Sequence, residues 1–257
     1  MVRAGDRAKG PARTSVWLEG RQRAARGGQP SGLDRDRITR VTVRLLDAEG
    51  PAKFSMRRLA AELNVTAMSV YWYVDTKDDL LELALDSVFG ELELPDPESG
   101  EDWRDQLCAL ASGYRALLVR HPWVSPLIGS FLNIGPHSMA FSLCVQHVMR
   151  NTGLPAHGQM GAIAAVYQFV YGFGTIEGHF VQRCASAGMT QDEYFHRAMS
   201  TIREQPEFAQ NFESATDLME ARGGDTVEEM RERDFRFALE LLVAGIEAMT
   251  LRWGRGS

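Results

Sequence analysis

The sequence predicts an all-α protein. Apolar residues recur at helical spacing in almost every segment after residue 33, and no segment shows the period-two alternation of a β-strand. No internal repeat is evident. With 257 residues, 44% of them hydrophobic and 24% charged, the chain is long enough to bury a core in one large domain or two modest ones. We expect a small helical front domain joined by a helix to a larger helical bundle.

Residues 1–33 are rich in Gly, Arg, Ala and Pro and lack apolar periodicity. Such a segment buries too little apolar surface to offset the entropy lost on ordering, so we expect it to be disordered. It holds seven basic and two acidic residues, which leaves two interpretations open. The segment is either a passive solvated tail or a basic arm that contacts phosphates or enters a minor groove.

Residues 34–89 are expected to form the front domain, which begins with one long helix. Ile38 and Leu45 belong to an apolar series at helical spacing, and a Gly-Pro pair ends that series. Either Asp34 or Ser31 can cap the start of this helix.

Two short helices follow the first one. Ser55 can cap a helix that ends near Leu63, and Thr66 can cap another that covers residues 67–73. Asn64 tolerates a left-handed backbone better than most residues and opens a tight turn between them. Two short helices joined by a turn of about three residues make a helix-turn-helix.

A fourth helix is expected to link the front domain to the rest of the chain. Thr76 and Asp79 form a capping box at its start, and it runs to residue 89. The acidic, proline-containing stretch 91–101 is loop-like and places the domain boundary near residue 90. The second domain is expected at 102–253, with helices at 102–120, 122–133, 136–152, 155–187, 190–204, 206–222 and 226–253.

Charge is divided unevenly along the chain, whose net charge is −6. Residues 34–77 hold eight basic and six acidic residues, whereas the chain after them holds 13 basic and 26 acidic residues. A basic front and an acidic back favour a front domain that contacts nucleic acid. The most apolar segment, 161–174, is too short to span a membrane, and the N-terminus lacks the apolar core of a secretory signal. We therefore expect a cytoplasmic protein without a membrane partner.

The motifs G-x-S-x-G, Walker A and GxGxxG are absent, which disfavours an enzyme. The six histidines show no metal-ligand spacing, so no metal site and no cofactor are predicted, and whether a metal accompanies a bound ligand stays open. Cys108, Cys144 and Cys184 are odd in number and form no CxxC pair, which predicts reduced thiols. They are either small buried hydrophobes or redox sensors. A helical scaffold or adaptor, and more remotely a helical enzyme, are kept as alternative functions.

Residues 56–81, MRRLAAELNVTAMSVYWYVDTKDDLL, resemble the DNA-binding signature of the tetracycline-repressor (TetR) family of bacterial transcriptional regulators. The resemblance implies a recognition helix in the major groove of a double-stranded operator, with Arg57 on a base edge or phosphate and Lys77 on a phosphate. The full set of expected DNA contacts is Arg57, Thr66, Ala67, Met68, Ser69, Tyr71, Trp72, Tyr73 and Lys77.

The sequence departs from the common pattern of this family in two places. Asn64 stands where a glycine is usual, and Ala67 with Met68 offers few hydrogen bonds to bases. DNA shape and thymine methyl groups are therefore expected to carry much of the specificity. Two alternatives stay open: Tyr71 and Trp72 as core residues, and the basic residues as members of a solvated face.

The second domain also resembles this family. Residues 235–249, FRFALELLVAGIEAM, resemble the last helix of the tetracycline-repressor-like branch, and so does the step His121-Pro122-Trp123. The resemblance implies that this domain dimerises and binds a small-molecule effector, hydrophobic or aromatic, that releases the protein from its operator.

Two helices supply the expected interface of the homodimer. One carries an apolar stripe, Phe237, Leu241, Ile246 and Met249, and the other carries the small residues Gly161, Ala164, Ala165, Gly172 and Gly174. A two-fold dimer places two recognition helices about 34 Å apart to read a palindrome. The effector-binding candidates, each otherwise a core or surface residue, are Trp103, Trp123, Phe131, His137, Phe141, His147, Tyr167, Tyr171 and His179.

Overall fold

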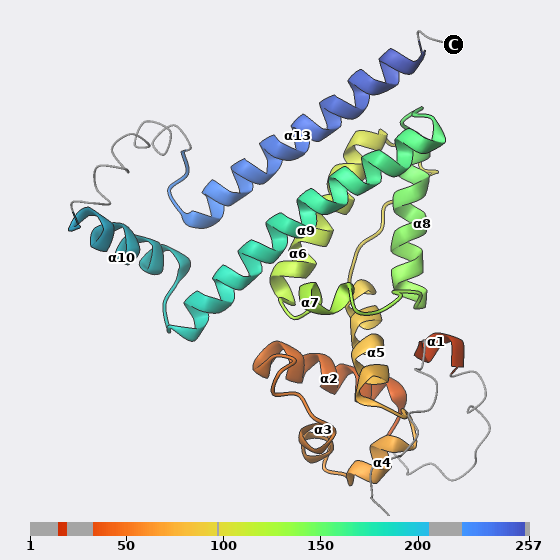
Figure 1. Ribbon diagram of the computed structural model, residues 1–257, viewed down its shortest axis with the longest axis vertical. Coiled ribbons are helices and arrows are strands. Elements are labelled where there is room, and N and C mark those ends of the chain that lie inside the picture. The colour runs from red at the N-terminus through yellow and green to blue at the C-terminus, as the bar shows by residue number, and fades with distance from the viewer. Residues whose placement is uncertain (1–14, 20–32, 97, 206–222, 255–257) are drawn as a thin grey trace, which may run out of the picture. The chain divides into compact units, whose positions relative to one another are not determined.

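The computed structural model describes residues 15–19, 33–96, 98–205 and 223–254, and within these ranges every regular element is a helix (Figure 1). The all-α prediction is therefore confirmed. The helices are α1 (Val16–Glu19), α2 (Arg35–Glu49), α3 (Met56–Glu62), α4 (Ala67–Tyr71), α5 (Lys77–Phe89), α6 (Trp103–Arg120), α7 (Val124–Ile128), α8 (Pro136–Arg150), α9 (Ala156–Ser186), α10 (Gln191–Arg203) and α13 (Val227–Gly254). Among the described residues, no helix is long and apolar enough to cross a membrane.

The expectation of disorder before residue 34 is wrong for residues 15–19, which contain helix α1. The hydroxyl of Ser15 and the backbone N–H of Val16 both donate to the buried carboxylate of Glu82 on α5. The side chain of Val16 is buried as well. Composition could not reveal this contact, because its partner lies far along the chain. The remainder of the segment up to residue 32 lies outside the described residues, as does the helix expected at 206–222.

The described residues divide into two compact units, and the second expected domain is not contiguous. The first unit combines the residues up to Glu91 with Pro126–Ala140, and the second combines Leu92–Ser125 with the chain from Phe141 onward. In the first unit, the buried carboxylate of Asp86 accepts the backbone N–H of Ser138 at 2.9 Å, at the start of α8. Gly135 allows this approach, because a Cβ atom there would lie only 2.3 Å from the Asp86 carboxylate.

The helix expected at 122–133 is shorter than predicted, and α7 ends at Ile128. The side-chain amide of Asn133 donates to the carbonyls of Ile128, at 2.6 Å, and Phe131, at 3.0 Å. Asn133 has a φ of 51°, in the left-handed region that asparagine tolerates. The Asn133 side chain thus gives these two carbonyls a hydrogen-bond donor in place of a helical backbone N–H. The chain after Ile128 therefore forms a turn.

In the second unit, α9 packs along α6, and α13 packs on α9 (Figure 1). The approach of α9 to α6 depends on glycine. A Cβ atom on Gly178 would lie 2.8 Å from the carbonyl oxygen of Leu118, and one on Gly174 would lie 3.1 Å from the Leu118 side chain. Gly174 therefore serves packing within the chain, whereas Gly161 and Gly172, also expected at a dimer interface, face open space.

Candidate DNA-binding site

Hydroxyl and carboxylate caps define the helices of the DNA-binding candidate at the expected positions. Asp34 accepts the N–H of Arg37, Ser55 that of Arg58, and Thr66 that of Ser69. Thr76 and Asp79 form the expected capping box at the start of α5. Each cap satisfies N–H groups that the first helical turn leaves without a partner, which fixes where α3 and α4 begin. Asn64 in the turn between them has a φ of 55°, as its residue type predicted.

Helix α4 and Trp72, the residue that caps its end, present three large side chains to solvent. Met68 is 69% exposed, Tyr71 41% and Trp72 58%, while Val70 is fully buried and anchors the helix. Three large exposed side chains gathered on one short segment are typical of a binding surface. The alternative that Tyr71 and Trp72 are core residues is therefore wrong. Their rings and the thioether can contact thymine methyl groups and sugar-phosphate edges in a major groove.

The two arginines at the start of α3 differ in their surroundings. Arg58 is bound to carboxylates on both sides, by Nε to Glu49 and by NH1 to Glu62, each at 2.9 Å. Arg57 is exposed, and among the described residues it forms no ion pair. Arg57 thus keeps its guanidinium available for an external acceptor such as guanine or phosphate.

Two further residues of the expected set have contacts within the chain. The hydroxyl of Tyr73 donates to the backbone carbonyl of Leu33, so Tyr73 braces the start of α2. The Nζ atom of Lys77 donates to the carbonyl of Pro51 at 3.3 Å and lies 5.6 Å from the centre of the Phe54 ring. Half-buried Lys77 therefore ties the start of α5 to the segment between α2 and α3.

Lys53 is exposed in that same segment and was not among the DNA contacts predicted from the sequence. A basic residue shortly before a helix-capping serine was the signal that could have identified it. The hydroxyls of Thr66 and Ser69 lie 2.9 Å apart at the start of α4. The hydroxyls of Thr66 and Ser69, together with Arg57, add polar groups beside the apolar surface of α4. This combination is suited to phosphate contacts around a groove-reading helix.

The expected effector residues do not converge on one place. A small cavity of about 20 Å³ in the second unit lies between α6, α8 and α9, and of the nine candidates only Phe141 and Tyr167 line it. Tyr114, which the sequence analysis missed, completes an aromatic cluster there, with its ring centre 4.7 Å from that of Tyr167 and 5.6 Å from that of Phe141. Burial raises the pKa of both tyrosine hydroxyls, so they stay protonated and can donate hydrogen bonds.

The other seven candidates lie elsewhere. Phe131 and exposed His137 belong to the first unit. Trp123 is buried against His121, and the Tyr171 hydroxyl donates to the carbonyl of Ser125. The remaining three are Trp103, beneath the guanidinium of Arg104, half-buried His147 and exposed His179.

The cysteines resemble small core residues more than redox sensors. Cys144 and Cys184 are buried and Cys108 is half-buried, and all three are free thiols. Burial raises the pKa of Cys108 and of Cys144, which lowers the fraction of reactive thiolate.

Comparison with known proteins identifies the family. Residues 38–84 match the description "Bacterial regulatory proteins, tetR family", and residues 94–250 match "Tetracyclin repressor-like, C-terminal domain". The first match covers the helix-turn-helix, and the second covers most of the remaining helices.

Two relatives support this assignment over most of the chain. An "HTH-type transcriptional regulator" of Saccharopolyspora erythraea is 35% identical over 216 residues, which cover 84% of this chain and 85% of that protein. The "HTH-type transcriptional repressor DrrR1" of Streptomyces coeruleorubidus is 32% identical over 234 residues, covering 91% and 84%.

Solved structures share the fold. Apo ActR from Streptomyces coelicolor is similar with a TM-score of 0.67 and 24% identity, covering 89% of this chain and all of that one. ActR in complex with actinorhodin gives 0.66 and 26%, covering 85% and 97%. These relatives are regulators, so the alternative of a helical enzyme is set aside. The chain belongs to the TetR family of bacterial transcriptional regulators and carries the tetracyclin repressor-like C-terminal domain.

Proposed function

We propose that this protein is a cytoplasmic repressor that binds a palindromic operator as a homodimer and is released by a small hydrophobic or aromatic effector. The observation that carries the proposal is the exposed surface of α4, formed by Met68, Tyr71 and Trp72 beside Arg57. This surface exposes two aromatic rings and the guanidinium of Arg57. The helices that carry them begin at capped positions, and a groove-reading helix requires such fixed side chains. The relative named as a transcriptional repressor supports the direction of regulation.

The proposed dimer interface lies on α13 and α9. Helix α13 has two apolar faces: Phe235, Leu239 and Ile246 are buried within the chain, whereas Phe237 is 64% exposed and Leu241 60%. Ile246, expected in the interface stripe, therefore belongs to the core of the unit. On α9, Ile176 is exposed and Gly161 and Gly172 face open space. Two exposed apolar helices in each chain fit a four-helix interface with two-fold symmetry.

The proposed effector site is the cavity lined by Tyr114, Phe141 and Tyr167. Its free volume of about 20 Å³ holds roughly one water molecule, so an effector enters only as α6, α8 and α9 separate. Helix α8 continues back to Ser138, whose backbone N–H is bound by Asp86 of α5. A shift of α8 is thereby transmitted to the helix that follows the helix-turn-helix. A coupling of about 1–3 kcal/mol is sufficient for such a response.

Removing the hydroxyl of Tyr114 or Tyr167 tests this effector site. Tyr114→Phe and Tyr167→Phe keep the shape of the rings and remove one hydrogen-bonding group each, so about 3- to 10-fold more effector should be needed for release. Actinorhodin, the ligand in one ActR structure, is the probe, and band shifts on DNA upstream of the protein's own gene give the readout.

Tyr194→Phe is the matched control, because Tyr194 lies on α10 and packs on Phe180. Affinity for DNA should be unchanged in all three variants. Equal release of the wild type and both cavity variants, or failure of actinorhodin to release the wild type, contradicts the proposed effector site.

A further inference from the structure

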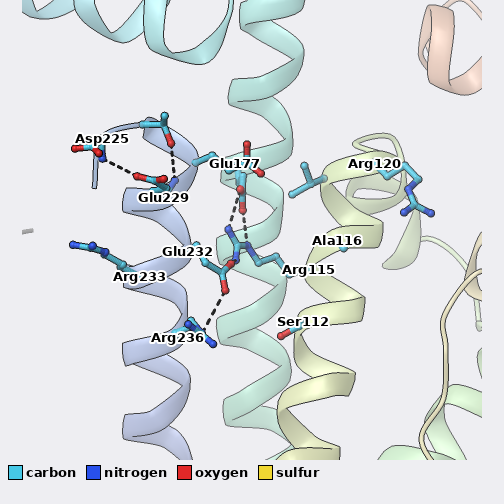
Figure 2. A pocket seen from close by; sticks show the side chains of 13 residues that line it. Ser112, Arg115, Ala116, Arg120, Glu177, Asp225, Glu229, Glu232, Arg233 and Arg236 are labelled. Carbon is cyan, nitrogen blue, oxygen red and sulfur yellow. Dashed lines mark hydrogen bonds and ion pairs between the residues drawn. The ribbon is translucent and has the colours of Figure 1, made fainter. Parts of the chain in front are cut away.

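A second hollow in the same unit lies apart from the proposed effector cavity. It is an open groove of about 1110 Å³ between α6, α9 and the first turns of α13 (Figure 2). Polar and apolar surface contribute about equally to its lining, which includes Arg115 and Arg120 from α6, Glu177 from α9, and Glu232 and Arg236 from α13. The groove is large enough for a drug-sized molecule.

Arg115 forms the fixed cation of this groove. Its Nε donates to Glu177 at 2.7 Å and its NH2 to the other oxygen of the same carboxylate at 3.0 Å (Figure 2). Its guanidinium also lies 4.5 Å from the ring centre of Phe235 and 5.1 Å from that of Phe173. A guanidinium held by a bidentate carboxylate and two rings is oriented before any ligand arrives.

The third guanidinium nitrogen of Arg115 has a more exposed partner. Its NH1 donates to Glu232 at 2.6 Å. The side chain of Glu232 is 52% exposed, whereas that of Glu177 is 8% exposed. Glu232 also lies 3.6 Å from Arg236, one turn along α13, which is exposed. The carboxylate of Glu232 can therefore leave Arg115 and turn toward solvent, where Arg236 still pairs with it. The buried carboxylate of Glu177 stays on Arg115.

We propose that this groove binds a small molecule that carries a carboxylate, and that this carboxylate replaces Glu232 on NH1 of Arg115. The exchangeable partner of the fixed cation is itself a carboxylate, so the geometry for that group already exists. The acidic residues Asp225, Glu228 and Glu229 also line the groove and repel multiply charged anions, which favours a ligand with one negative charge. This site goes beyond the proposed function, because it needs neither the DNA-binding surface nor the tyrosine cavity.

Isothermal titration calorimetry with 2-naphthoate and its neutral analogue 2-naphthamide tests the proposal on the full chain. Wild-type protein should bind 2-naphthoate at least about tenfold more tightly than 2-naphthamide, because only the carboxylate carries the negative charge that pairs with the Arg115 guanidinium. Glu232→Gln removes the negative charge of the internal competitor, which leaves only a neutral amide on NH1 of Arg115, and should tighten 2-naphthoate binding roughly tenfold.

Glu240→Gln is the matched control, since it removes the same charge from an exposed residue of the same helix, about two turns away, that does not line the groove. It should change affinity by less than about threefold, as expected for a screened surface charge. A purely structural role for the ion pair predicts that Glu232→Gln lowers the melting temperature without changing affinity for the probe. The proposal is overturned by that result, by absence of 2-naphthoate binding, or by equal affinity for the amide.

Discussion

Replacing Arg57 with alanine is expected to weaken operator binding at least roughly 30-fold. An arginine on a base edge or phosphate contributes about 1–3 kcal/mol, and a two-fold dimer loses this contact in both half-sites. Arg57 is exposed on α3 and forms no ion pair among the described residues, so none of these residues competes with the operator for it. Fluorescence anisotropy with a labelled operator measures the change.

Arg58→Ala is the control for charge, because it removes the same positive charge one residue away. Arg58 is already bound to Glu49 and Glu62, so we expect its loss to change operator affinity by less than about threefold. Equal losses for the two variants would mean that nonspecific charge, rather than a directed contact, explains the role of Arg57.

Leu241→Glu is expected to convert the protein into monomers at micromolar concentration and to lower operator affinity at least roughly 100-fold. In a two-fold interface the substitution places two carboxylates in an apolar contact, which costs several kcal/mol. Because Leu241 is 60% exposed in the single chain, the substitution should leave the fold of each monomer intact. Sedimentation velocity measures the mass, and circular dichroism checks the fold.

Leu143→Glu makes the same change at a leucine on α8 that is similarly exposed. This variant should remain dimeric and bind the operator normally. A dimeric Leu241→Glu protein would place the interface on another surface of the chain.

Local signals in the sequence predicted the DNA-binding helices well. Ser55, Thr66 and the Thr76–Asp79 pair cap the helices at the positions where their types and spacing indicated. Asn64 adopts the left-handed backbone that its side chain tolerates. These features depend on residues a few positions apart, so a single sequence contains the information that they need.

Features that depend on distant residues were predicted poorly. The contact of Ser15 with Glu82 and that of Asp86 with the start of α8 join segments that no periodicity connects. Helical spacing also could not show which apolar face of α13 is buried, because Phe235 and Phe237 belong to different faces of a helix that is apolar on both. Helical spacing likewise could not show that Tyr114, fully buried in α6, lines a cavity.

DNase I footprinting of the full chain on the DNA upstream of its own gene tests the central claim most directly. If α3 and α4 read an operator as the two halves of a dimer, one palindromic segment is protected, with half-site centres about 10 base pairs, or one helical turn, apart. This protection should persist as salt rises through the range where nonspecific binding is lost. Uniform protection without a preferred sequence, or none at all, would contradict the claim and favour a helical adaptor that retains the domain without specificity.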